Sequence, residues 1–386
     1  LYEDEVQTSF GVVKGTITSL QGRSIVSFRG IPYAKKITGE NRFKDPLLPI
    51  PWTSKLFANK KVMCPQLERR FKLRQNDIPQ SEDCLYLNIF FPITGINQKM
   101  PVLVYFHGGE FKYGSKDLYE PDSLLRAKDW VFVTVNYRLG ALGFLSTGDN
   151  VAGGNYGLKD QLLALRWIQS QIENFRGDRN RITIFGHDAG AVSVDIFRVA
   201  PKSATLESLF NNAISVSGTV FSPWAIQYEP RNNSIELARR VKCSISSSEK
   251  MIACLRETPL NEILEKGHDL SFAPSVDQSN SKSLLRDDPK ILYQNGDFTN
   301  VRHLFGLTES EGALDYFWRS EQIKSYNRTE KIRQLLQPYS RPYSNLNVIA
   351  SIVHYNYFGR VNVPESEEEQ RMIDVSFFYT LILYFK

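Results

Sequence analysis

Short apolar runs alternate along the chain with longer segments in which apolar residues recur at helical spacing. Residues 102–106 (VLVYF) and 131–135 (VFVTV) are two such runs, and each is followed by polar residues or glycines. Continuous apolar runs of this length are typical of strands that are buried on both faces of a parallel sheet. The alternation predicts an α/β fold, with a mostly parallel sheet wrapped by helices.

The region around residues 158–195 carries the most informative pattern. Leucines and isoleucines within residues 158–175 fall on one face of a helix, and Gly177 and Asp178 then break the pattern. The run at 182–185 (ITIF) predicts a strand, the turn at 186–190 (GHDAG) follows, and a second apolar helical pattern begins at Ala191. A strand, a tight Gly-x-x-x-Gly turn and a helix form the context of a hydrolase nucleophile elbow.

Composition narrows the function classes. The chain has 386 residues, of which 42% are hydrophobic, and a net charge of +5. This charge is mild for the length, and no Lys/Arg block or nucleic-acid motif occurs, so nucleic-acid binding is not expected. No apolar stretch reaches the roughly 18 residues of a membrane span. No spacing of Cys and His suggests a metal site, and no cofactor motif is present.

Four cysteines and two glycosylation sequons bear on the cellular compartment. The cysteines are Cys64, Cys84, Cys243 and Cys254, and the sequons begin at Asn232 and Asn327. Free buried thiols and two local disulfides are both compatible with these spacings, and disulfides would imply secretion. The sequons agree with a secretory route, although such triplets also arise by chance.

Several stretches, taken together, resemble the cholinesterase and carboxylesterase family of α/β-hydrolases. They are residues 28–34 (FRGIPYA), 82–89 (EDCLYLNI), 136–140 (NYRLG) and 154–158 (GNYGL), in the order in which the family has them. The resemblance implies a central, mostly parallel, twisted sheet flanked by helices. It implies one domain over residues 1–386 that lacks the C-terminal part of the family domain. It also implies Cys64–Cys84 and Cys243–Cys254 disulfides and an extracellular location, either secreted or as the ectodomain of a cell-surface protein.

The resemblance places the family's catalytic positions in this chain, and the nucleophile is changed. The family carries serine in the middle of Gly-Glu-Ser-Ala-Gly, whereas this chain has Asp188 there, preceded by His187. A carboxylate has no hydroxyl that a base could activate. Glu311, within residues 306–312 (GLTESEG), is similar to the family's triad acid.

The base and the oxyanion hole also depart from the family's pattern. None of the five histidines stands in a Gly-x-x-His-Gly context after Glu311, where the family keeps its base. Of the expected oxyanion donors, Gly109 and Ala189 are kept, whereas Glu110 replaces the family's third glycine. A carboxylate beside a developing oxyanion opposes its stabilisation, and losing one donor raises the barrier by about 3 kcal/mol.

These changes predict that three carboxylates, those of Glu110, Asp188 and Glu311, crowd one pocket. Ionised carboxylates do not share a poorly solvated site unless one is protonated, a cation binds, or an Arg or Lys neutralises them. The sequence leaves these three alternatives open.

The leading hypothesis is a non-catalytic member of the family that acts in extracellular recognition or cell adhesion. Inactive relatives such as neurotactin, glutactin and the neuroligins have this role. The expected partner is an extracellular protein of unknown identity, and a homodimer is possible. The polar loops around residues 69–74 and 275–283 are candidate binding surfaces. One alternative is a hydrolase that uses Asp188 as its nucleophile, and another is a carrier of a small apolar ligand.

Overall fold

The computed structural model describes residues 4–67, 78–94, 99–200, 209–222, 224–277, 283–309, 311 and 332–333. Contacts divide the chain into two units. The first comprises Leu1–Val220 and Ala225–Phe305, and the second comprises Phe221–Trp224 and Gly306–Lys386. Nearly all described residues belong to the first unit. The loop at 69–74, Asn327 and most of the loop at 275–283 lie outside the described residues.

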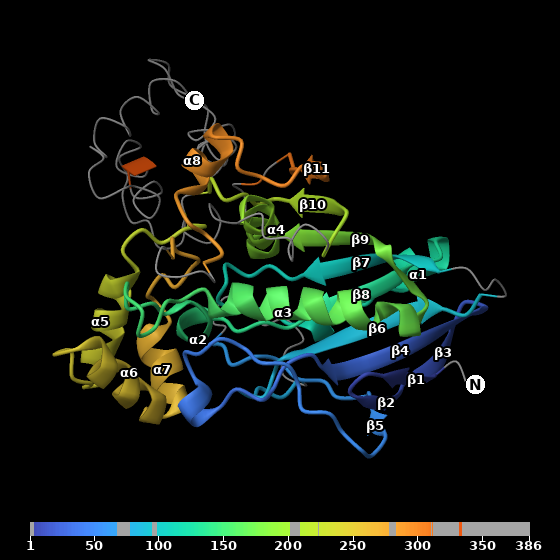
Figure 1. The fold of residues 1–386 in the computed structure, drawn as a ribbon, viewed down its shortest axis with the longest axis horizontal. Coiled ribbons are helices and arrows are strands. Elements are labelled where there is room, and N and C mark those ends of the chain that lie inside the picture. Colours follow the sequence, from blue (N-terminus) through green and yellow to red (C-terminus); the bar gives the residue numbers. More distant parts are fainter. Residues whose placement is uncertain are drawn as a thin grey trace, which may run out of the picture. The chain divides into compact units, whose positions relative to one another are not determined.

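A sheet of eight strands, in the order β11-β10-β9-β7-β8-β6-β4-β3, forms the centre of the first unit (Figure 1). Its four middle strands β10, β9, β7 and β8 are parallel, and β6, β4 and β3 continue the sheet in antiparallel pairs. The strands of this sheet are β3 (Thr16–Leu20), β4 (Arg23–Pro32), β6 (Tyr86–Pro92), β7 (Met100–Phe106), β8 (Val131–Val135), β9 (Gly177–His187), β10 (Asn212–Val216) and β11 (Arg302–Gly306).

Helices cover this sheet, and Figure 1 shows α3 running across one of its faces. Helix α4 packs against β9, β10 and β7, whereas α2 packs against α3 and α7. The α-helices are α1 (Asp122–Ala127), α2 (Gly140–Phe144), α3 (Tyr156–Gln171), α4 (Ala189–Val199), α5 (Pro230–Arg240), α6 (Ser248–Glu257), α7 (Leu260–Gly267) and α8 (Pro289–Gln294). The 3-10 helices are η1 (Gly39–Asn41), η3 (Lys116–Leu118) and η4 (Ile172–Phe175).

A small second sheet lies at the N-terminal end of the chain. It joins β1 (Glu5–Thr8), β2 (Gly11–Lys14) and β5 (Leu56–Phe57) in the order β1-β2-β5. The segment between η1 and β5 contains no regular element and carries several exposed apolar residues.

The burial of the central strands explains the apolar runs of the sequence. All five residues of β8 are buried, and so are six of the seven residues of β7. Leu103 of β7 belongs to one buried cluster with Phe132 of β8, Phe90 of β6 and Leu125 of α1. Because successive side chains of a strand face opposite sides, a strand covered on both faces shows no apolar–polar alternation.

The element boundaries differ from the sequence prediction at one point. Residues 158–175 form α3 followed by the 3-10 turn η4, and β9 begins at Gly177, five residues before the apolar run that predicted it. The additional residues of β9 are polar, and three of them are exposed. Gly177 pairs with Met100 and Ile182 with Val102, so the four polar residues between them form an irregularity that interrupts the pairing with β7.

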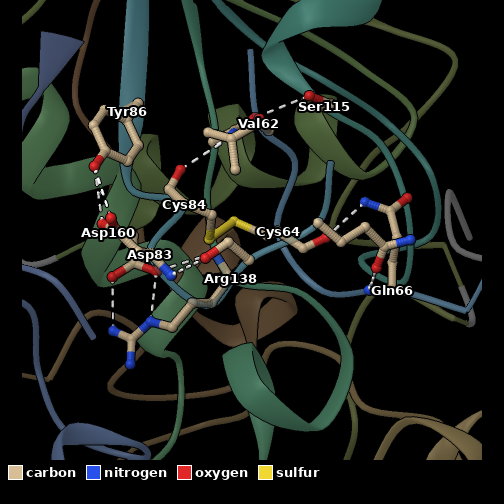
Figure 2. Close-up of a disulfide and its surroundings, with 12 residues drawn as sticks. Val62, Cys64, Gln66, Asp83, Cys84, Tyr86, Ser115, Arg138 and Asp160 are labelled. Atoms are coloured by element: carbon tan, nitrogen blue, oxygen red, sulfur yellow. Dashed lines mark hydrogen bonds and ion pairs between the residues drawn. A yellow bond between two sulfur atoms is a disulfide. The ribbon is translucent and has the colours of Figure 1, made fainter. Parts of the chain in front are cut away.

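Both cysteine pairs are disulfide-bonded in the structure. The Cys64–Cys84 bond has an S–S distance of 2.03 Å and precedes β6, whereas Cys243–Cys254 links the end of α5 to α6 with an S–S distance of 1.97 Å. The first bond lies among buried polar groups (Figure 2). Gln66 donates its side-chain N–H to the Cys64 carbonyl at 2.9 Å, and Asn136 donates to the Cys84 carbonyl at 3.1 Å.

Candidate functional site

The parallel strands β7 and β9 bring the two altered sequence motifs together. Phe106 ends β7, His187 ends β9, and the strands are hydrogen-bonded neighbours that run in the same direction. Their carboxyl ends therefore meet at one edge of the sheet, where ligand sites of open α/β sheets lie. The glycine turn after β7 and Asp188 after β9 face each other at this edge.

Asp188 occupies a sharp turn between β9 and α4. Its backbone has φ 53° and ψ −118°, a conformation that side-chain-bearing residues rarely adopt. Close backbone approaches enforce this turn. A Cβ on Gly190 would meet the Phe106 carbonyl oxygen at 2.0 Å, and one on Gly186 would meet the Gly190 carbonyl carbon at 2.1 Å. The Asp188 N–H donates to the Val216 carbonyl of β10 at 3.0 Å, which fixes the turn from its other side.

The Asp188 carboxylate is held by two backbone N–H groups of the turn after β7. Its Oδ2 accepts from the N–H of Gly109 at 2.7 Å and from the N–H of Glu110 at 2.9 Å. We call these two N–H groups the donor pair. Two converging N–H donors at a strand end are the usual geometry for stabilising an oxygen that carries negative charge. In this structure, the negatively charged oxygen is supplied by the chain's own side chain.

The donor pair depends on an unusual backbone. Gly109 has φ 109° and Glu110 has φ 51°, so both lie in the region that favours glycine. A Cβ at Gly109 would meet the Tyr113 carbonyl oxygen at 2.1 Å, so no other residue fits there. Glu110 adopts its conformation in spite of its Cβ, and its N–H still donates. The negative side chain has replaced the family's glycine without removing the donor.

Buried phenols next to the site respond to the charge of Asp188. Burial raises the pKa of Tyr137 well above its usual value, and the nearby Asp188 carboxylate raises it further. The pKa of Tyr119 is raised by the same two causes, although a hydrogen bond with Tyr105 opposes them. Both phenols are therefore neutral hydrogen-bonding groups at physiological pH and do not act as bases.

None of the four histidines within the described residues hydrogen-bonds to Asp188. His107 is buried, and burial lowers its pKa to about 4, so it is neutral at pH 7. His303 lies 3.0 Å from the Ser215 hydroxyl, and burial and Arg198 lower its pKa to about 4. His187 and His268 are exposed, and the fifth histidine lies outside the described residues.

Glu311 belongs to the second unit of the chain. Its Oε1 accepts from the N–H of Thr308 at 2.6 Å within the same unit. The crowding of Glu110, Asp188 and Glu311 therefore stays a prediction. Two backbone N–H groups hold the Asp188 carboxylate, a contact that was not among the three expected alternatives and does not decide between them. Within the described ranges, no cluster of His, Cys, Asp or Glu has the geometry of a metal site.

Sequence reasoning missed the contact between Asp188 and the donor pair. It expected Gly109 and Ala189 as donors and regarded Glu110 only as an unfavourable charge. The signal that could have found the contact is the consecutive Gly108 and Gly109 directly after an apolar strand, because glycines there leave N–H groups accessible. Side-chain chemistry alone does not reveal a backbone donor.

Comparison with known proteins agrees with the architecture of the sheet and with the turn at Asp188. The family model described as "Carboxylesterase family" matches residues 2–377. The chain belongs to the carboxylesterase family. The α/β-hydrolase fold expected from the sequence is confirmed by this membership, as is the resemblance to the cholinesterase-like proteins.

The relatives of this carboxylesterase-family chain fall into two groups. Neuroligin-2 of Homo sapiens is 36% identical over 354 residues, which cover 80% of the chain and 41% of the neuroligin. Venom carboxylesterase-6 of Apis mellifera and juvenile hormone esterase of Tribolium castaneum are both 37% identical, over 80% of the chain and 57% and 55% of the esterases. The chain thus spans about half the length of these relatives.

Proposed function

We propose that this chain is a non-catalytic, cholinesterase-like domain that acts in extracellular recognition or adhesion. One observation carries the proposal. At the proposed nucleophile position stands Asp188, and its carboxylate oxygen is bound to the N–H groups of Gly109 and Glu110 at 2.7 and 2.9 Å. Asp188 has no hydroxyl to attack an ester, and its carboxylate fills the position where an ester oxyanion would bind.

Other features support an extracellular role. Two disulfides are typical of proteins that fold in an oxidising compartment. Asn232, the first residue of a sequon, is exposed in the first turn of α5, and we propose that it is glycosylated. The neuroligin relatives favour an extracellular protein partner and a homodimer. Within the described part of the chain, none of the helices is both long and apolar enough to cross a membrane.

The catalytic half of this proposal is tested with p-nitrophenyl acetate. The wild-type protein should release p-nitrophenolate no faster than buffer at any pH at which it is folded. Asp188→Ser should not gain activity, because Glu110 still stands beside the donor pair and triad members act as a unit. Turnover that scales with wild-type protein and disappears in Asp188→Ala would refute the non-catalytic assignment.

The recognition half is tested by binding of the purified protein to a panel of purified extracellular proteins. The proposal requires at least one partner whose binding survives Asp188→Ala, since the proposed surface lies outside the old catalytic site. If every binding event is lost in Asp188→Ala and kept in a surface-loop variant, the site itself is the ligand pocket and recognition is not its role.

The same contact also favours a second candidate, a hydrolase with Asp188 as the nucleophile. Oδ2 is held by the donor pair, and no hydrogen bond from a described residue engages Oδ1. Attack of Oδ1 on a saturated carbon would form an alkyl ester of Asp188 and expel the leaving group. Water would then add to the ester carbonyl carbon, with the negative charge on Oδ2 facing the donor pair, and collapse of this intermediate would release the alcohol and regenerate the carboxylate with one oxygen from water. This reaction needs a base that activates the water.

Isotope labelling separates the two candidates. The wild-type protein is incubated with alkyl halides and epoxides in ¹⁸O-water under single-turnover conditions, and the peptide that contains Asp188 is then analysed by mass spectrometry. Incorporation of ¹⁸O into the Asp188 carboxylate would establish the hydrolase. We expect no incorporation of ¹⁸O, because none of the described histidines contacts Asp188 to activate the water. An alkylated peptide without ¹⁸O would show that Asp188 attacks carbon but that its ester is not hydrolysed.

A further inference from the structure

An exposed apolar ridge lies in the segment between η1 and β5. Three large aliphatic side chains protrude there within four positions, with exposed fractions of 62% for Leu47, 54% for Leu48 and 67% for Ile50. Single exposed aliphatic residues are ordinary on protein surfaces, but a contiguous group marks an interaction surface. We call these three side chains the apolar ridge.

The ridge is held rigidly although it lies in a loop. Prolines stand at positions 46, 49 and 51, each of which fixes its own φ, and Pro49 is buried. The Lys35 N–H donates to the Leu47 carbonyl at 2.8 Å, and the Trp52 N–H donates to the Phe10 carbonyl at 2.7 Å. A surface whose conformation is fixed before binding loses little entropy when a partner arrives.

Exposed lysines flank the ridge in sequence, and one of them, Lys35, is held beside it by its backbone hydrogen bond to Leu47. Lys35, Lys36 and Lys44 are exposed, and none of them forms an ion pair with a described residue. Asp45 is neutralised by Lys159 at 2.8 Å, so Glu40 is the one exposed carboxylate of residues 35–52 that could offset the lysines. The surface therefore combines a rigid apolar centre with an excess of cationic side chains at its rim.

We propose that the apolar ridge and its three lysines form the docking surface for an acidic segment of a protein partner that also carries apolar side chains. This inference rests on the proposed recognition function and names its surface and the chemistry of its partner. A buried aliphatic centre provides affinity, and complementary rim charges provide specificity and a fast association rate.

Two other occupants fit less well. A second copy of this chain would bring the same lysines against each other, and the chain already has a net charge of +5. A membrane surface is usually entered by aromatic residues at the interface. Here the aromatic residue next to the ridge in sequence, Trp52, is partly buried, stacks on Phe10 at 6.3 Å and donates to the Val12 carbonyl at 3.0 Å.

The surface is tested with two triple variants of the purified chain. One removes the ridge (Leu47→Ser, Leu48→Ser, Ile50→Ser), and the other reverses its rim charge (Lys35→Glu, Lys36→Glu, Lys44→Glu). Matched controls change exposed residues elsewhere, namely Ile245→Ser with Ile291→Ser, and Lys250→Glu with Lys266→Glu and Lys290→Glu. Circular dichroism checks that each variant is folded, which is expected because every changed side chain is exposed.

The probe is a phage-displayed library of random linear peptides, selected on the wild-type protein. We expect enrichment of peptides that combine Asp or Glu with Leu or Phe. A synthetic copy of the enriched peptide should bind each triple variant at least about tenfold more weakly than it binds wild type and the controls. Its affinity for wild type should fall as salt rises. Vesicles of phosphatidylcholine with phosphatidylserine should not be bound.

Each contrary result overturns the proposal. It fails if no peptide is enriched, if enriched peptides lack carboxylates, if both triple variants bind as wild type does, or if the vesicles are bound through the ridge. The proposed recognition function is tested independently of this surface. If an extracellular protein from the panel binds wild type and both triple variants equally, recognition stands and this surface is not the one used.

Discussion

Asp188 combines a strained backbone with a negative charge that two backbone N–H groups stabilise. At φ 53°, any side-chain-bearing residue is unfavourable there, and the two hydrogen bonds to Gly109 and Glu110 offset part of that cost. A hydrogen bond to a charged group contributes about 1.5–3 kcal/mol to stability. The side chain thus has a structural role that an uncharged residue would not perform.

Replacing Asp188 should separate these two contributions. Asp188→Ala keeps the backbone strain and removes both hydrogen bonds, so we expect a loss of about 2 kcal/mol in the free energy of unfolding, since water reaches the half-buried site. Asp188→Asn keeps an acceptor oxygen and should lose about 1 kcal/mol. Asp188→Gly relieves the strain and should be more stable than Asp188→Ala by about 1 kcal/mol. Urea denaturation measures all three differences.

A small anion provides the control for this prediction. Formate should occupy the vacated donor pair in Asp188→Ala and raise its unfolding midpoint, with no such effect on wild type. Equal stability of Asp188→Ala and wild type, with no response to formate, would mean that the donor pair does not need an anion.

At the scale of single residues, the sequence predicted which residues occupy the site but not which of their groups are in contact. The absence of serine at position 188 and the presence of Glu110 were evident from the aligned motifs. The fact that Glu110 contributes its N–H although its side chain is unfavourable was not evident. That outcome depends on a φ of 51° at Glu110, and backbone conformation at a non-glycine residue has no signature in the residue type.

At the scale of elements, the disulfides hold segments that contain little regular structure. Cys64–Cys84 spans 20 residues and Cys243–Cys254 spans 11. The loop-closure estimate gives about 3 kcal/mol for each bond, and the difference in span changes it by less than about 0.5 kcal/mol. Burial therefore decides which bond contributes more. Cys64 and Cys84 are 2% and 0% exposed, whereas Cys254 is partly exposed.

Removing the first bond should therefore be the more harmful change. We expect Cys64→Ala with Cys84→Ala to lower the free energy of unfolding by about 1 kcal/mol more than Cys243→Ala with Cys254→Ala, because it also leaves a cavity in the core. Urea denaturation compares the unfolding free energies of the two double variants, and the comparison requires that this free energy falls with urea concentration at the same slope in both. An equal loss, or a larger one for the second pair, would mean that packing around Cys64 and Cys84 contributes little beyond loop closure.

How well each strand could be predicted from the sequence depends on whether its two faces are buried. The runs in β7 and β8 were recognised because both faces of these strands are buried. The first part of β9 was missed because residues 178–181 are polar, are partly exposed and interrupt the pairing with β7, so no apolar pattern marks them. The disulfide pairing came from the family resemblance, since spacing by itself left free thiols equally possible.

At the scale of the whole molecule, two buried groups make opposite contributions to acid stability. His107 has a folded pKa of about 4 against an ordinary 6.5, so the unfolded chain binds the proton first and stability falls as pH drops from 6.5 to 4. Burial raises the pKa of Asp195 from 3.8 to about 6, so the folded chain binds the proton first and stability rises as pH drops from 6 to 3.8.

The two effects are each about 3 kcal/mol over their full ranges, so these two largely offset each other, whereas His303, whose pKa is also lowered to about 4, acts in the same direction as His107. Asp195→Asn should remove the contribution of Asp195, which compensates for that of His107. Between pH 7 and pH 5, we expect this variant to lose about 1 kcal/mol more of its unfolding free energy than wild type, measured by urea denaturation at both pH values. His107→Gln should show the opposite deviation. If both variants follow the wild-type pH profile, neither group titrates differently on folding.

The contact between Asp188 and the donor pair also has a genetic consequence. Aspartate and serine codons differ at two nucleotides, so recovery of a nucleophilic hydroxyl must pass through an intermediate residue. The single-step intermediates are asparagine, glycine, alanine and tyrosine. Asparagine would still fill the donor pair with its amide oxygen, whereas glycine and alanine would vacate it. None of these three supplies a hydroxyl, and tyrosine places its hydroxyl at the far end of a ring. A serine at this turn therefore cannot be reached from Asp188 in one mutational step.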